Sequence, residues 1–423
     1  MLLCAGALLL AAAAADAASC PTVEVASPSW TAQVRNGTTI KVDGTTGCFS
    51  LSVDGELWLV SSHLLLSASG TVYREPHLPG HHRLTPAGSR QSEGADALGS
   101  FKAFSIDWVA SNSSGKEPEW STTFRAYASK LVFEQEYRTA VKDGQMGPPA
   151  TAESEGKGGT GAWGTPQSVF PSFSSAAGKA VNLGALTFHN QGSPQSSVGL
   201  AGLSTATMGF AGGVPVILVD NTTDLTMVIS PIDSFLSSTF AVAADPGDPA
   251  ALLCGVQGAA TAVPKGHRTQ VMLTVGEGLT DTVLHWGADL LHLYGKQPAT
   301  PDANVHIERL GYSTVGHFFY GLVRGKNAEQ TLRAVADDAK SMAVPYSWYL
   351  LDSWWYGENS TPLPTTFGGV NDSVPGYGGT WRWDDAIARS RGGNFPSGLR
   401  NLTNYLGAPL VMHFGEWVGN SST

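Results

Sequence analysis

Hydrophobic and polar residues alternate in short runs over the first two-thirds of the chain. In one such run, Phe133 and Tyr137 fall on one face of an extended segment. Glu134 and Glu136 fall on the other face, which predicts a half-buried strand. Equivalent runs predict strands at residues 39–42, 48–53, 57–61, 101–109, 122–128, 131–137, 214–219, 225–230 and 270–275. Many short strands without intervening helices indicate a β-sandwich domain over residues 19–277.

The spacing of apolar residues changes near Leu279 from two to about 3.6 residues. This spacing predicts a helix over residues 279–294. Its apolar stripe consists of Val283, Trp286, Leu290, Leu291 and Tyr294. A Pro-containing segment, 297–301, follows the helix, so we predict that residues 278–301 are a linker helix and connector between two domains.

Strands and helices alternate from residue 302 onward, beginning with a strand predicted around Leu310. Asn327 and Gln330 have the spacing of a helix capping box. The apolar stripe of that helix is predicted to contain Leu332, Val335, Ala336, Ala339 and Met342. The continuous apolar run at 346–351 then predicts a strand buried on both faces, as in a parallel sheet.

A second helix is predicted from Pro396-Ser397 to Gly407, and a third strand at 410–414. Strand and helix alternation of this kind is typical of a TIM-type barrel, which needs eight such units. Residues 302–423 contain three. We therefore expect a partial, truncated β/α barrel here, with its remaining units beyond Thr423.

The composition and net charge of the chain argue against some classes of binding partner. The formal net charge is −10, charged residues are 14 % of the chain, and Lys and Arg form no run. Nucleic acid is therefore not an expected partner, because phosphate binding needs clustered basic side chains. Cys and His show no metal-ligand spacing, so we predict neither a metal nor a cofactor. The sequence does not determine the oligomeric state.

The N-terminus has the pattern of a secretory signal peptide. Leu2 to Ala15 are almost all Leu, Ala, Gly and Cys, and small residues follow, which predicts a signal over residues 1–18. The alternative is a disordered alanine-rich terminus. The run is too short to span a membrane, and no other stretch approaches that length. Asn-X-Ser/Thr sequons at Asn36, Asn112, Asn221, Asn359, Asn371, Asn401 and Asn420 support a secreted or lumenal glycoprotein.

Three cysteines remain once Cys4 leaves with the signal. An oxidising compartment permits disulfides. We predict a bond between Cys20 and Cys48, because both lie in the N-terminal region. Cys254 is then either buried or paired with a cysteine outside this chain.

Six of the 12 tryptophans fall between residues 348 and 417: Trp348, Trp354, Trp355, Trp381, Trp383 and Trp417. A sugar ring presents C–H groups on its face and hydroxyls around its edge, so it suits an aromatic platform beside carboxylates. Trp355 and Trp383 are the candidates for such a platform. Core packing is the favoured interpretation of Trp348.

Two carboxylates follow predicted strands, at the end where barrels keep their active sites. Asp352 comes directly after the run 346–351, and Glu416 follows the third strand. Both are candidate substrate-binding residues. For Asp384 and Asp385 we favour a solvated or loop-structuring role. Glycoside cleavage needs two carboxylates about 5 to 9 Å apart, and the sequence leaves open whether Asp352 and Glu416 form such a pair.

The segments Leu310-Gly311-Tyr312, 349–355, Trp383-Asp384 and 394–399 occur in this order. Together they resemble the α-galactosidase/α-glucosidase clan of glycoside hydrolases, and are most similar to families 36 and 31. The Phe-Pro-X-Gly-Leu step at 395–399 is the most specific part. The resemblance implies a β-supersandwich before a (β/α)8 barrel, and a retaining enzyme that acts on α-linked glycosides.

The resemblance also implies that Asp352 binds sugar hydroxyls. Two features depart from the family 36 pattern. Asp352-Ser353-Trp354-Trp355 stands where that family has Asp-Asp-Gly-Trp, and Glu416 is shifted after the third strand. Galactose specificity is therefore left open. In the clan, the nucleophile and the acid/base follow the fourth and sixth strands, so the catalytic residues are unknown and the chain alone is expected to be inactive. A non-catalytic carbohydrate-binding or surface glycoprotein with a degenerate barrel is the alternative.

Overall fold

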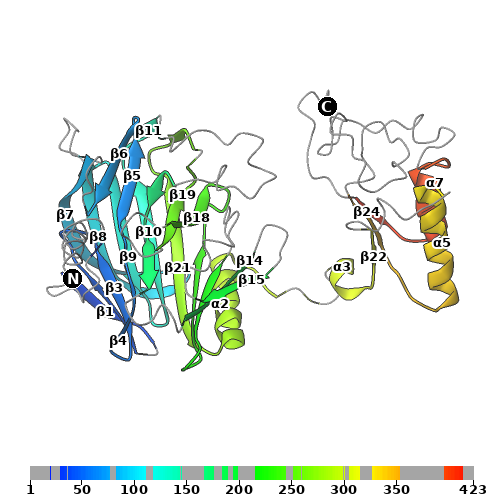
Figure 1. Cartoon of the computed structure of the whole chain (residues 1–423), viewed down its shortest axis with the longest axis horizontal. Helices are drawn as coiled ribbons and strands as arrows, with labels where there is room; N and C mark the ends of the chain where they lie inside the picture. The colour runs from blue at the N-terminus through cyan, green and yellow to red at the C-terminus, as the bar shows by residue number, and fades with distance from the viewer. Residues whose placement is uncertain are drawn as a thin grey trace, which may run out of the picture. The chain divides into compact units, whose positions relative to one another are not determined.

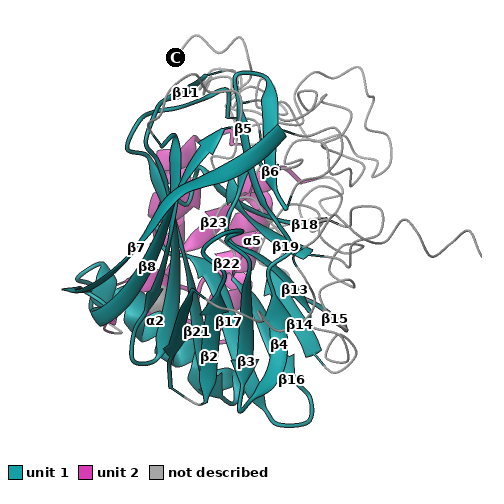
Figure 2. Ribbon diagram, turned by 90° about the vertical axis from the view of Figure 1, so that its left-hand side faces the viewer, with its two compact units in different colours: residues 1–297 teal, residues 298–423 magenta. Residues whose placement is uncertain are grey.

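The computed structural model describes residues 20, 29–35, 37–76, 82–110, 118–142, 144, 166–175, 183–188, 194–198, 215–243, 251–258, 260–298, 300, 304–314, 326–352 and 395–412. The chain divides into two compact units, residues 1–297 and 298–423 (Figure 2). Each unit is described by itself.

The first unit is built from two large sheets, one antiparallel and one antiparallel except for the parallel pair β6 and β7 (Figure 1). One has the strand order β1 (Trp30–Gln33), β2 (Thr38–Val42), β3 (Phe49–Val53), β4 (Glu56–Val60), β13 (Ser172–Ser175), β19 (Ala251–Val256) and β18 (Ser238–Ala243). The other has the order β12 (Ser168–Val169), β5 (Leu64–Ala68), β6 (Thr71–Glu75), β7 (His82–Asp96), β8 (Gly99–Ala110), β9 (Trp120–Ala126), β10 (Lys130–Tyr137), β21 (Arg268–Glu277), β17 (Leu225–Pro231), β16 (Val216–Asp220), β14 (Leu183–Phe188) and β15 (Pro194–Val198). A small pair, β11 (Val141–Lys142) and β20 (Ala262–Val263), lies apart from them in the strand order.

Every strand predicted from the alternating pattern is present, with ends that differ by a few residues. The turn between β3 and β4 shows why the local sequence suffices there. Asp54 and Gly55 have φ angles of 49° and 83°, and Val53 pairs with Glu56 across the turn. An Asp-Gly pair adopts positive φ at low cost and is favoured in two-residue hairpins.

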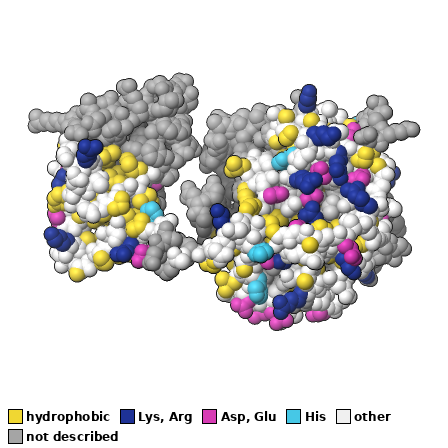
Figure 3. Space-filling model, turned by 180° about the vertical axis from the view of Figure 1, so that it is seen from behind, with side chains coloured by type: hydrophobic (Ala, Val, Ile, Leu, Met, Phe, Trp, Pro, Cys, Tyr) yellow, Lys and Arg dark blue, Asp and Glu magenta, His cyan; other side chains and the backbone are white. Residues whose placement is uncertain are grey.

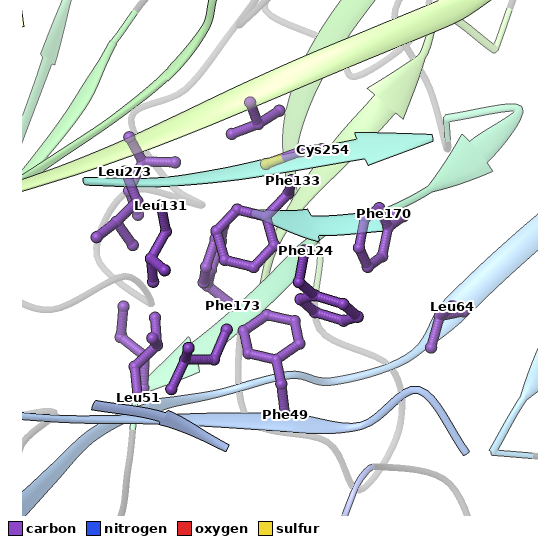
Figure 4. Packing of buried hydrophobic residues seen from close by; sticks show 14 of the residues in the cluster. Phe49, Leu51, Leu64, Phe124, Leu131, Phe133, Phe170, Phe173, Cys254 and Leu273 are labelled. Atoms are coloured by element: carbon purple, nitrogen blue, oxygen red, sulfur yellow. The ribbon is translucent and has the colours of Figure 1, made fainter. Parts of the chain in front are cut away.

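Aromatic side chains from both sheets fill the space between them (Figure 4). The ring of Phe49, on the seven-stranded sheet, lies 5.6 Å from that of Phe124 and 5.2 Å from that of Phe133, both on the twelve-stranded sheet. Phe173 completes the group at 5.7 Å from Phe49. Rings at these separations, mostly edge to face, are favourable aromatic pairs. The first unit is therefore a β-sandwich whose main core lies between its two sheets.

The prediction that β10 is half-buried is wrong for Glu134, which is 6 % exposed. Its carboxylate accepts hydrogen bonds from Arg125 on β9 and from Gln270 on β21, both at 2.7 Å. A carboxylate is buried readily only when such partners are present. These partners come from neighbouring strands, so the sequence of β10 alone does not indicate that Glu134 is buried.

The predicted disulfide between Cys20 and Cys48 is confirmed. Cys254 on β19 is a free thiol and is fully buried in the core of the sandwich. Burial raises the pKa of this thiol well above its ordinary value. Of the two possibilities left open for Cys254, the structure shows the buried one.

Helix α2 (Leu279–Leu293) matches the predicted helix and packs on β21 and β17 of the larger sheet. The indole nitrogen of Trp286 donates to the hydroxyl of Ser230 on β17 at 2.7 Å. The side chain of Lys130 on β10 pairs with Asp289 of the helix. By these contacts the helix belongs to the first unit.

The second unit contains a parallel sheet in the order β22 (Tyr312–Ser313), β23 (Tyr349–Leu351) and β24 (Leu410–Met412). The helices in the described part of this unit are α3 (Val305–Glu308), α5 (Ala328–Ser341) and α7 (Leu399–Leu406). The capping box of Asn327 and Gln330 is present with both hydrogen bonds, and Gly407 ends α7 in the left-handed conformation. Parallel strands that alternate with helices confirm a partial β/α arrangement.

Three details of this unit differ from the predictions. The strand predicted around Leu310 lies at Tyr312–Ser313, and Leu310 precedes it and is 55 % exposed. The middle strand begins at Tyr349 and not at residue 346, because the chain from Met342 to Ser347 turns back to the sheet after α5. Met342 is 67 % exposed and does not belong to the buried stripe. It is the C-cap residue of α5, where the helix axis has already ended and the side chain is no longer held against the sheet.

None of the helices that the structure describes is long and apolar enough to cross a membrane. Within those same residues no group of three or more His, Cys, Asp or Glu side chains has the geometry of a metal site.

Candidate functional site

Asp352 stands directly after β23, the middle of the three parallel strands. Leu350 pairs with Ser313 on β22 and with Val411 on β24. The carboxyl ends of the three strands therefore meet at one edge of the sheet, and Asp352 lies at that edge. The residue is half-buried. This is the strand end at which α/β folds keep their ligands.

The backbone of Asp352 is held by Thr314, the residue that follows β22. The backbone nitrogen of Asp352 donates to the Thr314 hydroxyl oxygen at 3.1 Å. The same hydroxyl donates to the carbonyl oxygen of Leu350 at 2.8 Å, and the Thr314 nitrogen donates to that carbonyl at 3.2 Å. Thr314 is fully buried. One side chain therefore continues the pairing of β22 and β23 past the last paired residues and fixes the backbone where Asp352 begins.

The remaining predicted site residues, Trp355, Trp383 and Glu416, lie outside the described residues. Asp384 and Asp385 do so as well. Their proximity to Asp352 stays a prediction.

Trp348 is not part of this edge, since it precedes β23 and lies at the opposite end of the strand. Its indole nitrogen donates to the carbonyl oxygen of Arg309 at 3.2 Å, and the ring of His306 meets it edge-on at 4.9 Å. The indole also covers Gly311, where an added Cβ would lie 2.0 Å from the ring. Trp348 is half-buried and packs against the chain that enters β22, outside the core cluster of the second unit, so the prediction of core packing is wrong.

The Phe-Pro-X-Gly-Leu step joins the starts of α5 and α7. Phe395 is fully buried in the core of the second unit. The Ser397 nitrogen donates to the Glu329 carboxylate at 2.8 Å, and the Ser397 hydroxyl donates to it as well. Arg333, one turn later on α5, donates to the same carboxylate at 2.9 Å. In the described residues, the step that carries most of the family resemblance links the starts of α5 and α7.

The environment of Glu329 shifts its acidity. Burial favours the neutral form, but the donors from Ser397 and Arg333 outweigh burial and lower the pKa of Glu329 below its ordinary value. The side chain is 5 % exposed. It remains a carboxylate at neutral pH, which suits a fixed structural link and not a proton donor.

Two features were not predicted from the sequence: the role of Thr314 and the link between Glu329 and Ser397. Nothing in the sequence marks Thr314 as a residue that positions Asp352, because a single threonine after a short strand is common. Glu329 stood in the first turn of a predicted helix, where acidic residues are favoured for their interaction with the helix dipole. Its partner Ser397 comes from a segment 68 residues away.

A carboxylate at this edge can accept hydrogen bonds from a ligand. An ionised Asp is an acceptor with two oxygens, so it receives two hydrogen bonds from neighbouring hydroxyls. Half-burial strengthens such bonds relative to open water. Because the backbone of Asp352 is already fixed by Thr314, little conformational freedom is lost when a ligand binds. The arrangement is suited to holding a polyhydroxyl compound.

No protein-family model matches the chain, and no curated protein matches it. Among solved structures, a beta-arabinopyranosidase is similar to it with 12 % identity and a TM-score of 0.47, covering 91 % of this chain and 55 % of that one. The alpha-N-acetylgalactosaminidase NagBb from Bifidobacterium bifidum has 13 % identity and a TM-score of 0.47, with 91 % and 58 % covered. A glycoside hydrolase family 97 enzyme from Pseudoalteromonas sp. strain K8 in complex with acarbose has 11 % identity and a TM-score of 0.44, with 90 % and 53 % covered.

The chain thus spans a little over half the length of the solved structures that it resembles. Those structures are glycosidases by their descriptions. At these identities and TM-scores the similarity establishes neither a family nor an activity for this chain.

Proposed function

We propose that this chain belongs to a secreted protein that acts on α-linked glycosides with retention of configuration, in the manner of α-galactosidases and α-glucosidases of families 36 and 31. In this proposal the first unit is a β-supersandwich, and the second is the beginning of a TIM-type barrel. Asp352 binds sugar hydroxyls, and Trp355 or Trp383 stacks on the sugar ring. Glu416 is a further substrate-binding residue.

The observation that carries the proposal is the position of Asp352. It is a half-buried carboxylate at the shared carboxyl edge of three parallel strands, with its backbone nitrogen held by Thr314. The order of sequence motifs around it supports the sugar as the ligand. Figure 3 adds that Lys and Arg side chains are interspersed with Asp and Glu on the face it draws of the first unit, which gives no support to a polyanion as the ligand.

Retaining hydrolysis needs a nucleophile and an acid/base about 5 to 5.5 Å apart. The family pattern puts both after later strands of the barrel, so the proposal assigns this chain a substrate-binding role and assigns no catalytic residue within it. A protein that binds sugars without cleaving them remains the second candidate, and the same experiment separates the two.

The experiment compares binding and cleavage of a panel of 4-nitrophenyl α-glycosides by the complete gene product. Replacing Asp352 with Ala removes a charged acceptor whose hydrogen bonds contribute about 1.5 to 3 kcal/mol each. We expect kcat/KM, or the association constant if nothing is cleaved, to fall at least tenfold. The matched control is Asp338→Ala, at an exposed aspartate on α5.

The outcomes are distinct. If no glycoside binds to the unmodified protein, the proposed function is wrong. Binding without cleavage favours the carbohydrate-binding alternative. Activity that survives Asp352→Ala within twofold leaves a glycosidase in place but excludes Asp352 from its site.

Secretion is part of the proposal and rests on the signal pattern and the sequons. Asn221 is exposed in the turn between β16 and β17, and Asn401 is exposed on α7. Both positions are accessible to a glycan. Treatment of the purified protein with an endoglycosidase should lower its mass, and an unchanged mass would count against the secretory route.

A further inference from the structure

Strand β7 presents an unusually long open edge. Its first two residues, His82 and Arg83, pair with β6, and from Leu84 to Asp96 the described pairing of β7 is with β8 alone. Figure 1 shows β7 at the margin of the first unit. The backbone N–H and C=O groups on the outer side of this strand therefore form a row without a described strand beside it, which is a template for another strand.

The side chains of this segment leave the edge accessible. Residues 87–93 are all exposed, so neither face of this stretch is covered. The side chains are small or polar, and the stretch contains no lysine. Sheet edges are commonly protected by lysine, proline or bulges. Here Pro86 and a register shift between Pro86 and Gly88 protect the beginning of the edge only.

Charge is distributed unevenly along this edge. His82, Arg83 and Arg90 lie in its first part, and Glu93 and Asp96 lie in its last part. Two antiparallel copies place the basic part of one strand beside the acidic part of the other. Opposite charges on neighbouring strands stabilise pairing, and like charges directly opposite destabilise it. A parallel arrangement in register would bring like charges together.

We propose that two copies of this chain associate through β7, paired antiparallel about a two-fold axis at Ser92. A two-fold axis perpendicular to the sheet keeps each residue on its own face. The axis therefore runs midway between the two copies of one residue, and the interface is isologous. With the axis at Ser92, Arg90 stands opposite Gly94 of the second copy and diagonal to its Asp96. Glu93 stands opposite Gln91.

The neighbouring register is less favourable. With the axis at Gln91, each Arg90 lies diagonal to Arg90 of the second copy, and Asp96 stands opposite Pro86, which lacks an N–H group. The Ser92 register brings two Arg90–Asp96 pairs within diagonal reach for one Glu93–Glu93 diagonal. Within each copy Arg90 also donates to Asp107 at 2.7 Å and Asp96 accepts from Tyr127 at 2.6 Å, so the pairs between copies add to these contacts. An interface made mainly of one strand from each copy buries less than the surface typical of stable complexes, so the dimer should dissociate on dilution.

Sedimentation velocity over a range of concentrations tests the association. The unmodified chain should pass from monomer to dimer as concentration rises. Ser92→Lys puts two like charges face to face at the axis and should leave a monomer throughout. The matched control is Gln33→Lys, an exposed position on β1 at the edge of the other sheet, which should dimerise like the unmodified chain. A chain that stays monomeric, or a dimer unaffected by Ser92→Lys, would overturn the proposal.

Cysteine cross-linking tests the register independently. In Ser92→Cys the two introduced thiols face each other across the axis, within the Cα separation that a disulfide spans. This variant should form a covalent dimer under mild oxidation. In Ser89→Cys the two thiols are separated by about six residues along the strands, roughly 20 Å, and should not cross-link. Failure of Ser92→Cys, or equal cross-linking of both variants, would contradict the register.

Discussion

The hydroxyl oxygen of Thr314 lies 3.1 Å from the backbone nitrogen of Asp352. This contact links two residues 38 positions apart and joins the ends of two neighbouring parallel strands. Thr314 is fully buried and Asp352 is half-buried, so the hydrogen bond lies at the boundary between the core of the second unit and the proposed site. It makes the position of the candidate sugar-binding residue depend on a side chain that need not touch the ligand.

Replacing Thr314 with Val should loosen the backbone at Asp352. The valine keeps the shape of threonine but leaves the Asp352 N–H and the Leu350 carbonyl without this partner. Unmaking a buried hydrogen bond costs about 1 to 3 kcal/mol. Amide hydrogen exchange of the segment around Asp352 should accelerate by about tenfold or more in Thr314→Val and return close to the unmodified rate in Thr314→Ser. Equal exchange in all three proteins would show that the hydroxyl does not hold this backbone.

The Glu329 carboxylate should stabilise the contact between α5 and α7. Glu329→Gln replaces an accepting oxygen with an NH2 group that faces donors from Ser397 and Arg333. Hydrogen bonds to a charged group contribute about 1.5 to 3 kcal/mol, so we expect a loss of about 2 to 3 kcal/mol in the opening free energy of the two helices. Native-state hydrogen exchange measures it. Asp338→Asn, at an exposed position on α5, should change it by less than about 0.5 kcal/mol.

The sign of the pH dependence follows from the lowered pKa of Glu329. A carboxylate whose pKa is lower in the folded state contributes stability above its ordinary pKa of 4.5 and loses that contribution as the pH falls through the folded value. The difference between the unmodified chain and Glu329→Gln should therefore shrink in acid. A difference that is constant down to about pH 2 would contradict the assigned donors.

The parts of this fold that the sequence predicted are those fixed by neighbouring residues. The hairpin at Asp54-Gly55 and the capping box of Asn327 and Gln330 each depend on contacts within four residues, so their sequence patterns are sufficient. Glu134 shows the limit. Its alternation with Phe133 predicted an exposed side chain, but its burial depends on Gln270, 136 residues away.

The candidate site shows the same limit. Asp352 was found because it follows an apolar run, which is a local signal. Its partner Thr314 was not found, since their contact exists only once two strands pair. The most specific motif, at 395–399, turned out to position α7 against α5, because Ser397 needs the Glu329 carboxylate. A motif identifies a fold more reliably than it identifies a ligand-binding residue.

Thiol titration should report both the disulfide and the processing of the N-terminus. Cys20 and Cys48 are bonded, and Cys254 is fully buried with a raised pKa. A mature chain without Cys4 should therefore show no reactive thiol when native and one when denatured without reductant. Two thiols after denaturation would show that Cys4 is retained, and three or more would show that the disulfide does not form.

The bond between Cys20 and Cys48 should also stabilise the first unit. The two residues are 28 positions apart. Closing a loop of that length in the unfolded chain corresponds to about 3 to 4 kcal/mol in the chain-entropy account. The double variant Cys20→Ser/Cys48→Ser should lower the thermal transition of the first unit. The change should vanish when both proteins are compared in the presence of reductant.

Asp233 should make the first unit less stable as the pH rises from about 4 to 6. Burial raises the pKa of Asp233 to about 6, and the negative charge of Glu134 adds to the shift, against a hydrogen bond from the Gln270 nitrogen at 2.7 Å and the charge of Arg125. The folded state thus binds the proton more tightly than the unfolded state, whose aspartate has the ordinary pKa of 3.8. Between these two values stability is lost with rising pH, and above about 6 the loss is complete.

Asp233→Asn removes this titration and keeps an oxygen to accept the Gln270 N–H. Relative to the unmodified chain, the variant should gain stability between pH 4 and pH 6.5 and then hold a constant difference. A shift of two pKa units corresponds to about 3 kcal/mol. Because Asp233 is only partly buried, screening by water should reduce this to about 1 to 2 kcal/mol. Thermal unfolding of both proteins across that range measures the difference. If it does not change between pH 4 and pH 6.5, Asp233 titrates like an ordinary surface aspartate, and its side chain is not buried in the folded chain.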